Sequence, residues 1–216
     1  MTYLISTEDF SEDFWRKIQK CERIVSPGII NQSSKKHSLL GRVLLSYILY
    51  KNGKDNRLTF TYGVNEKPYL KDGRAFFNIS HSGSYVICSV SENEIGCDVQ
   101  TVEKYNPRIA TRFFTENEKL FLEKSENQSE DFTRLWTLKE SVLKKTGEGI
   151  TGGLASFCFA DSLTQNSFIK FGYHFRVNKL IGAYISICSD APENEITEIN
   201  KAEIEKYTDS VLKGEL

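Results

Sequence analysis

The chain runs twice from a helix-forming segment into short apolar strands. In residues 34–53, SKKHSLLGRVLLSYILYKNG, apolar side chains recur at helical spacing, and the strand-like run SYVICSVS follows at 84–91. In the second half, DFTRLWTLKESVLKKTGEG at 131–149 has one apolar face, and the strand-like run GAYISICS follows it. Because helices and strands recur in the same order, we expect an α+β fold made by duplication of two similar α/β halves, residues 1–101 and 102–216.

The shorter elements are predicted from local patterns. The apolar runs SYVICSVS and IGCDVQ are separated by the turn-like SENE and predict a β-hairpin over 84–100. Thr115, followed three residues later by Glu118, has the form of a capping box, which opens a helix and needs no chemistry from the glutamate. The runs ASFCFA and FIKFGYHFRV predict strands over 155–160 and 168–177, and the polar C-terminal segment predicts a frayed helix.

Composition limits the partners and the compartment. The formal net charge is -1 and the sequence pI is about 6.3, so no overall basic field favours nucleic acid, and any anion site must be local. Five cysteines form no CxxC pair and cannot all close into internal disulfides, which fits reduced thiols in the cytosol. No apolar run approaches the ~20 residues that span a bilayer. We therefore expect a cytoplasmic protein with neither nucleic acid nor membrane as a partner.

Two oxygen-bearing side chains interrupt an apolar strand in GCDVQ, residues 96–100. Successive side chains in a strand alternate between faces, so Asp98 and Gln100 point the same way. A hard cation such as Mg²⁺ takes oxygen ligands and keeps waters and substrate phosphates in its remaining positions, so one or two protein ligands suffice. The alternative interpretation is an edge strand with a solvated polar face.

A second candidate cluster lies in the helix-forming segment WTLKESVLKK. Glu140 and Lys144 are four residues apart and so are neighbours on one helix face, and Lys139 and Lys145 add positive charge around the single glutamate. A carboxylate for a metal ion and lysines for phosphate oxygens form one interpretation. An ordinary surface salt bridge worth a few tenths of a kcal/mol is the other.

Polar and basic residues in the first half offer candidate anion contacts. The segment NISHSG, residues 78–83, has the composition of a turn that presents hydroxyl, imidazole and backbone N–H groups to an anion. Lys17 and Lys20 are three residues apart on a predicted helix. A polar turn and a solvated helix face are the alternatives.

The order of these segments carries a resemblance that none of them carries alone. NISHSG, a strand, GCDVQ, FFTENE and WTLKESVLKK follow one another as in the phosphopantetheinyl transferases, in the larger two-halved class that activates peptide, polyketide and fatty-acid synthases, and the chain resembles that family from Lys67 to Gly149. The W-x-x-K-E-x-x-x-K spacing together with N-I-S-H-S and G-x-D makes the match specific. The resemblance implies two α/β halves related by a pseudo-twofold, with the cofactor substrate bound between them.

The resemblance also implies roles at the reacting centre. Asp98 and Glu140 match metal-binding acids, and Gln100 falls where many members have a third carboxylate, so a site with this neutral oxygen ligand would hold one negative charge fewer. Glu118 matches the general base of the family. Lys144 matches a lysine near the pyrophosphate, which makes Glu118, Glu140 and Lys144 the predicted catalytic residues.

The coenzyme A contacts are implied in the same way. The predicted set comprises lysines, hydroxyls and an imidazole that hold the donor's phosphates and its pocket: Lys17, Lys20, Ser38, Lys67, Ser80, His81, Lys139 and Lys144. The N-terminal half would then supply the phosphate-binding turn and the metal-binding strand, and the C-terminal half the catalytic helices.

The expected reaction is Mg²⁺-dependent transfer of 4′-phosphopantetheine from coenzyme A to a serine of an apo acyl or peptidyl carrier protein, with release of adenosine 3′,5′-bisphosphate. Residues 103–114, which include Arg108 and Arg112, are expected to dock the acidic carrier. A Mg²⁺-dependent pyrophosphatase or phosphodiesterase acting on coenzyme A is one alternative, and a non-catalytic carrier-binding module is another. Because both halves of the cleft come from one chain, we expect a monomer.

Overall fold

The chain folds into two compact units, and each is built on its own sheet. The computed structural model describes all residues except 9, 22–23, 25–34, 150–152 and 193–194. The first unit comprises Met1–Tyr62, Pro68–Glu92 and Asn194–Leu216, and the second comprises Gly63–Lys67 and Asn93–Glu193. No helix within the described ranges is long and apolar enough to cross a bilayer.

The first unit has a four-stranded sheet in the order β10-β1-β5-β4 and a separate β2–β3 pair. Its strands are β1 (Thr2–Ser6), β2 (Phe60–Tyr62), β3 (Pro68–Leu70), β4 (Phe76–Ser82), β5 (Tyr85–Ser91) and β10 (Thr197–Glu198). Its helices are α1 (Glu12–Gln19), α2 (Lys35–Lys51) and α6 (Lys201–Lys213). The predicted long helix is confirmed as α2, whose Leu40, Val43 and Leu44 are fully buried in the core of this unit.

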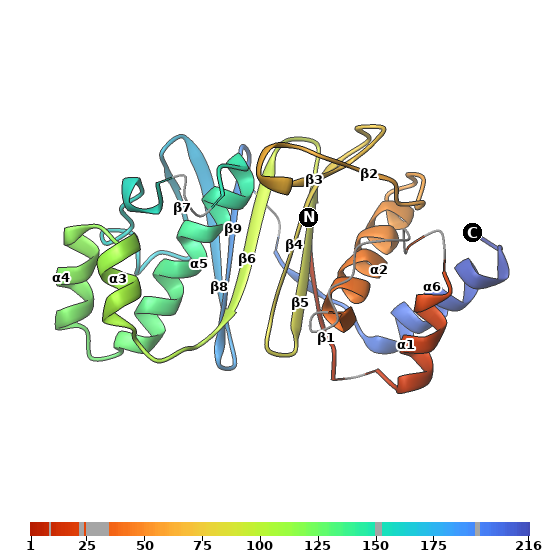
Figure 1. Cartoon of the computed structure of the whole chain (residues 1–216), viewed down its shortest axis with the longest axis horizontal. Helices are drawn as coiled ribbons and strands as arrows, with labels where there is room; N and C mark the ends of the chain where they lie inside the picture. Colours follow the sequence, from red (N-terminus) through yellow and green to blue (C-terminus); the bar gives the residue numbers. More distant parts are fainter. Residues whose placement is uncertain (9, 22–23, 25–34, 150–152, 193–194) are drawn as a thin grey trace. The chain divides into compact units, whose positions relative to one another are not determined.

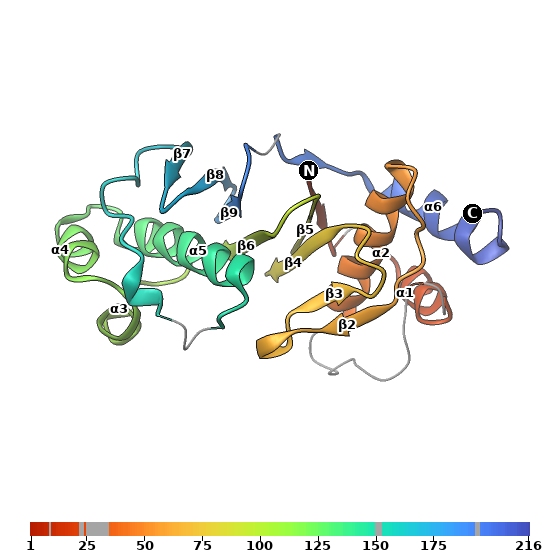
Figure 2. The same ribbon diagram turned by 90° about the horizontal axis from the view of Figure 1, so that it is seen from above.

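The second unit has a four-stranded sheet in the order β6-β9-β8-β7, with its helices in one core against it (Figures 1 and 2). Its strands are β6 (Ile95–Thr101), β7 (Ser167–Lys170), β8 (Tyr173–Leu180) and β9 (Ala183–Ser189). Its helices are α3 (Pro107–Phe113), α4 (Glu116–Lys124) and α5 (Gln128–Thr146), with short 3₁₀ turns at Val64–Glu66 and Leu154–Ser156. The longest helix, α5, packs on β6 and β9.

The two sheets share the arrangement of three strands. In the first unit β1 pairs with β5, which pairs with β4, and both pairings are antiparallel, as are those of β6 with β9 and β9 with β8 in the second. The fourth strands differ, because β10 pairs in parallel with β1, whereas β7 pairs antiparallel with β8. In each unit the long helix lies in sequence between the first strand and the hairpin, and it packs on the sheet that they form. The predicted α+β class with two similar halves is therefore confirmed, and the structure adds a strand before the helix in each half, which was not predicted.

Membership of the units differs from the predicted halves 1–101 and 102–216. Strand β6 belongs to the second unit because it pairs along its whole length with β9 and lies against α5. Helix α6 belongs to the first unit because it packs on α2. The predicted hairpin over 84–100 is wrong. Strand β5 pairs with β1 and β4, whereas β6 pairs with β9.

Four further local predictions need correction. FIKFGYHFRV is not one strand, because β7 and β8 form a hairpin with its turn at Phe171 and Gly172. ASFCFA is a 3₁₀ turn followed by irregular chain, and NISHSG lies mostly within β4, with only Gly83 (φ 56) in the turn. The C-terminal helix is anchored and does not fray, because Ile204, Tyr207 and Val211 are buried. Asn200 caps its first turn by accepting from the Glu203 backbone N–H.

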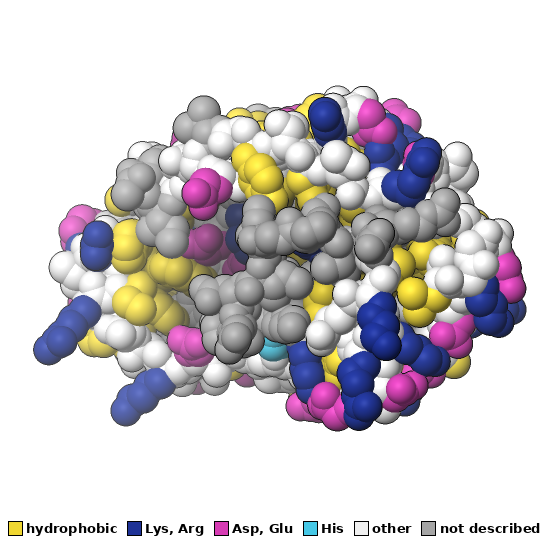
Figure 3. Space-filling view, turned by 45° about the vertical axis from the view of Figure 1, so that its right-hand side comes forward, with side chains coloured by type: hydrophobic (Ala, Val, Ile, Leu, Met, Phe, Trp, Pro, Cys, Tyr) yellow, Lys and Arg dark blue, Asp and Glu magenta, His cyan; other side chains and the backbone are white. Residues whose placement is uncertain are grey.

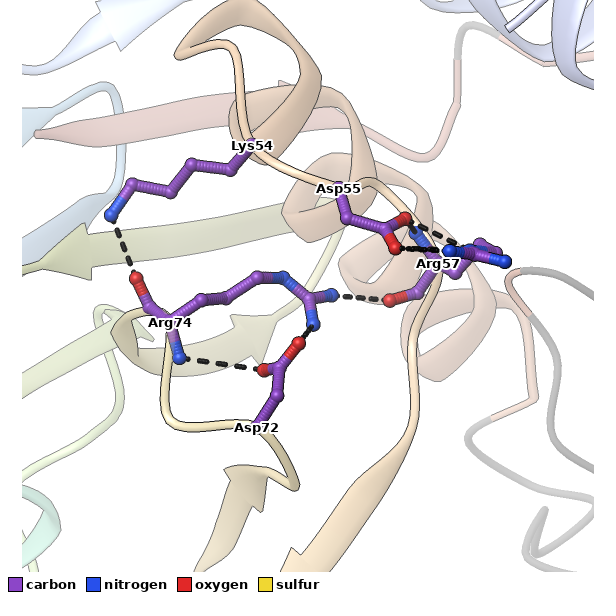
Figure 4. A network of polar contacts seen from close by, with 5 residues as sticks. All are labelled: Lys54, Asp55, Arg57, Asp72 and Arg74. Atoms are coloured by element: carbon purple, nitrogen blue, oxygen red, sulfur yellow. Dashed lines mark hydrogen bonds and ion pairs between the residues drawn. The ribbon is translucent and has the colours of Figure 1, made fainter.

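A charged network fastens the loops on either side of the β2–β3 pair (Figure 4). The Arg57 guanidinium binds both oxygens of Asp55, while Arg74 binds Asp72 and the backbone carbonyl of Arg57. Lys54 donates to the carbonyl of Arg74 at 2.7 Å. These contacts tie the chain that enters β2 to the chain that leaves β3.

Candidate active site

Asp98 and Glu140 come together because α5 lies unusually close to β6. A Cβ atom at Gly96 would lie 2.0 Å from the Ser141 carbonyl oxygen and 2.4 Å from the Lys145 nitrogen, so only glycine permits this approach. Gly96 and Asp98 share a strand face. The carboxylate of Asp98, 5% exposed, therefore faces the turn of α5 that carries Glu140 and Lys144. This accounts physically for the G-x-D pattern.

Lys144 binds the strand acid directly. Its Nζ donates to Asp98 Oδ1 at 2.6 Å, and the side chain stays 28% exposed. Burial lowers the pKa of Lys144, but the charge and hydrogen bond of Asp98 raise it by more, so the pKa lies above its ordinary value. Lys144 is thus a fixed positive charge beside the two acids.

Glu140 is a half-buried carboxylate that its surroundings satisfy poorly. Its Oε1 is buried and has no hydrogen-bond partner among the described residues. Burial raises the pKa of Glu140, and the negative charge of Asp98 raises it further, while Lys144 lowers it. The electrostatic coupling shows that the strand acid and the helix acid act on one another.

This pair has the chemistry of a divalent-cation site. An unsatisfied buried carboxylate oxygen beside a second carboxylate is stabilised by a hard cation, and Mg²⁺ is commonly held by one or two carboxylates. The described part of the chain has no group of three or more histidine, cysteine or acidic side chains suited to a metal ion. The residues present therefore fit a two-carboxylate site for Mg²⁺.

Gln100 points toward a different partner. Its Nε2 donates to Glu103 Oε1 at 2.9 Å. Both residues line a cavity of about 270 Å³ together with Ile109, Phe132, Thr133 and Trp136. The sequence analysis missed Glu103, and the only available signal was its position three residues after Gln100 at the end of the strand. The metal contact predicted for Gln100 stays a prediction.

Glu118 and Lys139 form an ion pair with no exposed surface. Lys139 Nζ lies 2.8 Å from Glu118 Oε2, and it also donates to the carbonyls of Leu154 and Phe157. Glu118 accepts from the backbone and hydroxyl of Thr115, which completes the predicted capping box. Burial lowers the pKa of Lys139, and the negative charge of Glu118 partly offsets this.

The remaining oxygen of Glu118 accepts from the Phe159 backbone N–H at 2.9 Å. Both carboxylate oxygens are thus occupied, and the side chain has no face toward solvent. Lys139 is equally enclosed. The general-base role of Glu118 and the coenzyme A contact of Lys139 stay predictions, and the geometry supports a role for both in fixing residues 154–159 against α4 and α5.

The part of the chain that carries these side chains is similar to a known protein family. Residues 94–188, which contain Asp98, Glu118, Glu140 and Lys144, match the family model of the 4′-phosphopantetheinyl transferase superfamily (ACPS). Over these residues the chain is similar to this superfamily. It is 34% identical over 145 residues to the 4′-phosphopantetheinyl transferase gsp of Aneurinibacillus migulanus, covering 65% of this chain and 61% of the relative.

A second relative gives a similar picture. The 4′-phosphopantetheinyl transferase Sfp of Bacillus subtilis (strain 168) is 33% identical over 146 residues, covering 65% of this chain and 63% of Sfp. The chain thus spans less than two thirds of the length of the curated relatives that it matches first. A crystal structure of Thermotoga maritima holo-[acyl-carrier-protein] synthase (AcpS) is similar at 19% identity and a TM-score of 0.31, covering 52% of this chain and 73% of that one.

Lys67, which was predicted at the coenzyme A pocket, is buried in the second unit. Its Nζ donates to Glu94 Oε2 at 2.5 Å and to the Lys145 carbonyl at 2.7 Å. Asn65 also donates to the Gly147 carbonyl at 2.9 Å. Lys67 therefore holds residues 63–67 against the C-terminal end of α5. The carbonyl that it binds belongs to the residue after Lys144, the lysine that binds Asp98.

In the first unit, His81 stacks on a second histidine. The rings of His37 and His81 lie 4.7 Å apart between centroids at an interplanar angle of 18°, and His37 Nε2 lies 2.8 Å from the Gly83 carbonyl oxygen. Ser80 is buried on β4, and Ser38 is half-buried in the first turn of α2. The NISHSG segment thus contributes one imidazole, that of His81, to a stacked pair, and α2 contributes the other.

Lys17 and Lys20 lie at the end of α1. Lys17 Nζ binds Asp209 on α6 at 3.2 Å, and the hydrogen bond to Asp209 is the main cause that raises the Lys17 pKa. Lys20 is exposed at the helix C-cap. On the face shown in Figure 3, lysine and arginine side chains lie among aspartate and glutamate side chains.

The sequence analysis also missed Arg42. This α2 residue is only 9% exposed, its Nη1 has no hydrogen-bond partner among the described residues, and its guanidinium lies 5.3 Å from the centroid of the Phe60 ring. Burial lowers the pKa of Arg42. The signal was present in LLGRVLL, where an arginine occupies an otherwise apolar helix segment.

Proposed function

We propose that this protein transfers the 4′-phosphopantetheine group of coenzyme A to a serine of an apo acyl or peptidyl carrier protein, with release of adenosine 3′,5′-bisphosphate. The observation that carries the proposal is the coupled Asp98–Glu140 pair with Lys144 beside it, within the residues that match the family model. Two acids and a lysine at one point suit a pyrophosphate with a bound divalent cation.

Each of these side chains has a defined task. Asp98 and Glu140 would hold Mg²⁺, which when bound neutralises negative charge on the pyrophosphate. Lys144 stays protonated because Asp98 raises its pKa, so it supplies a point charge for the oxygen of the departing nucleotide. Its partial exposure leaves the ammonium within reach of a substrate.

The phosphates of the donor would be held by polar groups of the first unit. The stacked imidazoles of His81 on β4 and His37 on α2 would bind one phosphate, and Ser80, the residue before His81, would contact the donor separately. Arg42 carries a guanidinium with an unsatisfied nitrogen, which a phosphate oxygen would satisfy. Lys67 would act indirectly, through the 63–67 segment that it fastens to α5.

The carrier would dock on α3 and the chain before it. Arg108 and Arg112 are exposed on this helix, and Asn106 caps its start by accepting from the backbone of Arg108. Carrier helices that present acidic side chains would be attracted to these two charges. We further propose that the protein acts as a monomer in the cytoplasm.

Incubation of an apo carrier with coenzyme A and Mg²⁺, followed by mass spectrometry of the carrier, tests the proposal. Transfer adds the phosphopantetheine mass to the carrier only when enzyme, coenzyme A and Mg²⁺ are all present. A pyrophosphatase would release free phosphopantetheine without a carrier, and a binding module would bind without turnover. Either of these results would exclude the proposed reaction.

A further inference from the structure

The two chain segments drawn in Figure 4, before β2 and after β3, line a cavity of about 540 Å³ in the first unit. Its lining residues are Asp55, Arg57, Thr59, Lys71, Asp72 and Arg74. The volume is within the roughly 300–1,000 Å³ of small-molecule sites, but none of these six side chains is aromatic or purely apolar. A ligand of this cavity would therefore be held by charge and by hydrogen bonds.

The lining has an excess of positive charge. Three cationic and two acidic side chains line the cavity, so its net charge is +1, whereas the whole chain carries -1. Lys54 donates to the Arg74 carbonyl at 2.7 Å and adds another positive charge beside the cavity. This local excess favours an anionic ligand.

Each acid of the lining is already bound by one arginine. Both oxygens of Asp55 accept from the Arg57 guanidinium, and Asp72 accepts from the Arg74 guanidinium and backbone N–H. The Nε–H of Arg74 is buried and has no hydrogen-bond partner among the described residues. The acids therefore do not use up the donors of the cavity.

Lys71 and Thr59 take no part in this network. The Lys71 backbone N–H donates to the Thr59 carbonyl at 2.9 Å, which extends the β2–β3 ladder by one rung and sets the two residues opposite each other. Leu58 and Leu70, which precede them, are buried in the core of the unit. Because side chains alternate along a strand, Thr59 and Lys71 point together to the exposed side. Neither side chain has a hydrogen bond or ion pair to any residue that the structure describes.

We infer that this cavity, which we call the Lys71 cavity, binds a small phosphate monoester that also carries hydroxyl groups. The Lys71 ammonium and the Thr59 hydroxyl would donate to the phosphate oxygens, since an ammonium is a point charge suited to phosphate. The Asp72 side chain is 53% exposed, and Arg74 uses two of the roughly four acceptor positions of its carboxylate. Asp72 would therefore accept from a hydroxyl of the ligand. The inference does not depend on the proposed transfer.

Calorimetric titration with ribose 5-phosphate, and separately with ribose and with inorganic phosphate, tests the inference. Wild type should bind ribose 5-phosphate, should bind inorganic phosphate more weakly because it offers less to Asp72, and should not bind ribose. Lys71→Gln should weaken the binding of ribose 5-phosphate about three- to tenfold, because it removes a charge-assisted hydrogen bond that water partly screens. Lys71→Arg should recover most of the affinity, because it restores the charge.

Lys213→Gln is the matched control, since it removes an exposed lysine of the first unit outside the cavity, and it should bind as wild type does. Lys71→Gln should keep the wild-type urea midpoint, because Lys71 is outside the network of Figure 4, and it should keep the wild-type KM for coenzyme A. Absence of binding in wild type, or equal affinity in wild type and Lys71→Gln, would overturn the inference. Displacement of ribose 5-phosphate by coenzyme A would also overturn it, because the cavity would then belong to the donor. A wild-type protein that binds ribose 5-phosphate but modifies no carrier would instead overturn the proposed function.

Discussion

Lys139 Nζ lies 2.8 Å from Glu118 Oε2, and neither side chain has any exposed surface. The pair joins α4 to α5 and holds the carbonyls of Leu154 and Phe157. Both charges are taken out of water, so each depends on the other for compensation. Residue 139 immediately precedes Glu140, so this buried pair also fixes the turn of α5 that carries the helix acid.

Replacing Lys139 by methionine should destabilise the protein strongly, because it leaves the Glu118 carboxylate buried without its counterion. Removing one partner of a buried pair costs about 3–5 kcal/mol in the free energy of unfolding. The double variant Lys139→Met with Glu118→Gln should be more stable than the single variant. Urea denaturation measures both, and a single variant as stable as wild type would contradict the paired burial.

Gly96→Ala should disturb the contact between β6 and α5. The new methyl would overlap the Ser141 carbonyl and the Lys145 nitrogen, which are backbone atoms and cannot rotate away. Overpacking typically costs about 1–3 kcal/mol, and this variant should lie at the upper end or beyond. Its phosphopantetheine transfer should fall too, because the acid pair is separated.

Gly41→Ala is the matched control for Gly96→Ala. Its added methyl would meet the Ile79 Cγ2 atom at 2.6 Å, the end of a side chain that can move. Thermal unfolding should therefore show a smaller loss for Gly41→Ala than for Gly96→Ala. The reverse order would show that the close approach at Gly96 is not limiting.

Asp55 should give the network of Figure 4 a pH dependence on the acid side. The hydrogen bonds from Arg57 lower the pKa of Asp55 from 3.8 to about 2. A depressed carboxyl pKa stabilises the fold above the unfolded-state pKa, and that stability is lost as the pH falls from 3.8 toward 2.

Asp55→Asn should therefore be less stable than wild type at pH 6 and equal to it near pH 2. The difference should be small, because the Asp55 side chain is 42% exposed and water screens the pair. Denaturation curves at the two pH values measure it. A stability difference that grows on acidification would have the wrong sign.

Neutralising Arg108 and Arg112 together should weaken carrier binding. The Arg108→Gln, Arg112→Gln variant should raise the KM for the carrier and leave the KM for coenzyme A unchanged. Added salt should raise the carrier KM of wild type more than that of the variant, since two charges no longer contribute. An unchanged carrier KM would show that docking occurs elsewhere.

The helices were predictable because their signals are local. The 3.6-residue period of α2 and α5 and the Thr115–Glu118 capping box are contained within short segments. The partners of β5 and β6 were not, because neither strand's own sequence specifies which distant strand lies beside it. ASFCFA misled for a related reason, since the carbonyl of its Phe157 and that of the preceding Leu154 bind Lys139, which is 15–18 residues away in sequence, instead of a strand.

The residues of the candidate site also divide into those with a local sequence signal and those without one. Asp98, Glu140 and Lys144 were predicted because the spacing of the motifs resembles a family; the structure brings Lys144 to Asp98, and the roles of the three residues stay predictions. Glu103 lacks a motif, and only the hydrogen bond from Gln100 and the cavity bring it into view. Exposure and orientation depend on the whole fold, so the sequence alone could not show that Glu118 is fully enclosed whereas Glu103 is exposed.

The most direct test of the account is the binding of a divalent ion to Asp98 and Glu140. Titration with Mn²⁺, followed by water-proton relaxation, should show a site in wild type that weakens in both Asp98→Asn and Glu140→Gln. Each variant should lose at least about tenfold in affinity, which corresponds to ~1.4 kcal/mol. Glu148→Gln, which changes an exposed acid beyond α5, should bind as wild type does. Unchanged Mn²⁺ affinity in Asp98→Asn or Glu140→Gln would contradict a shared ion between the strand acid and the helix acid.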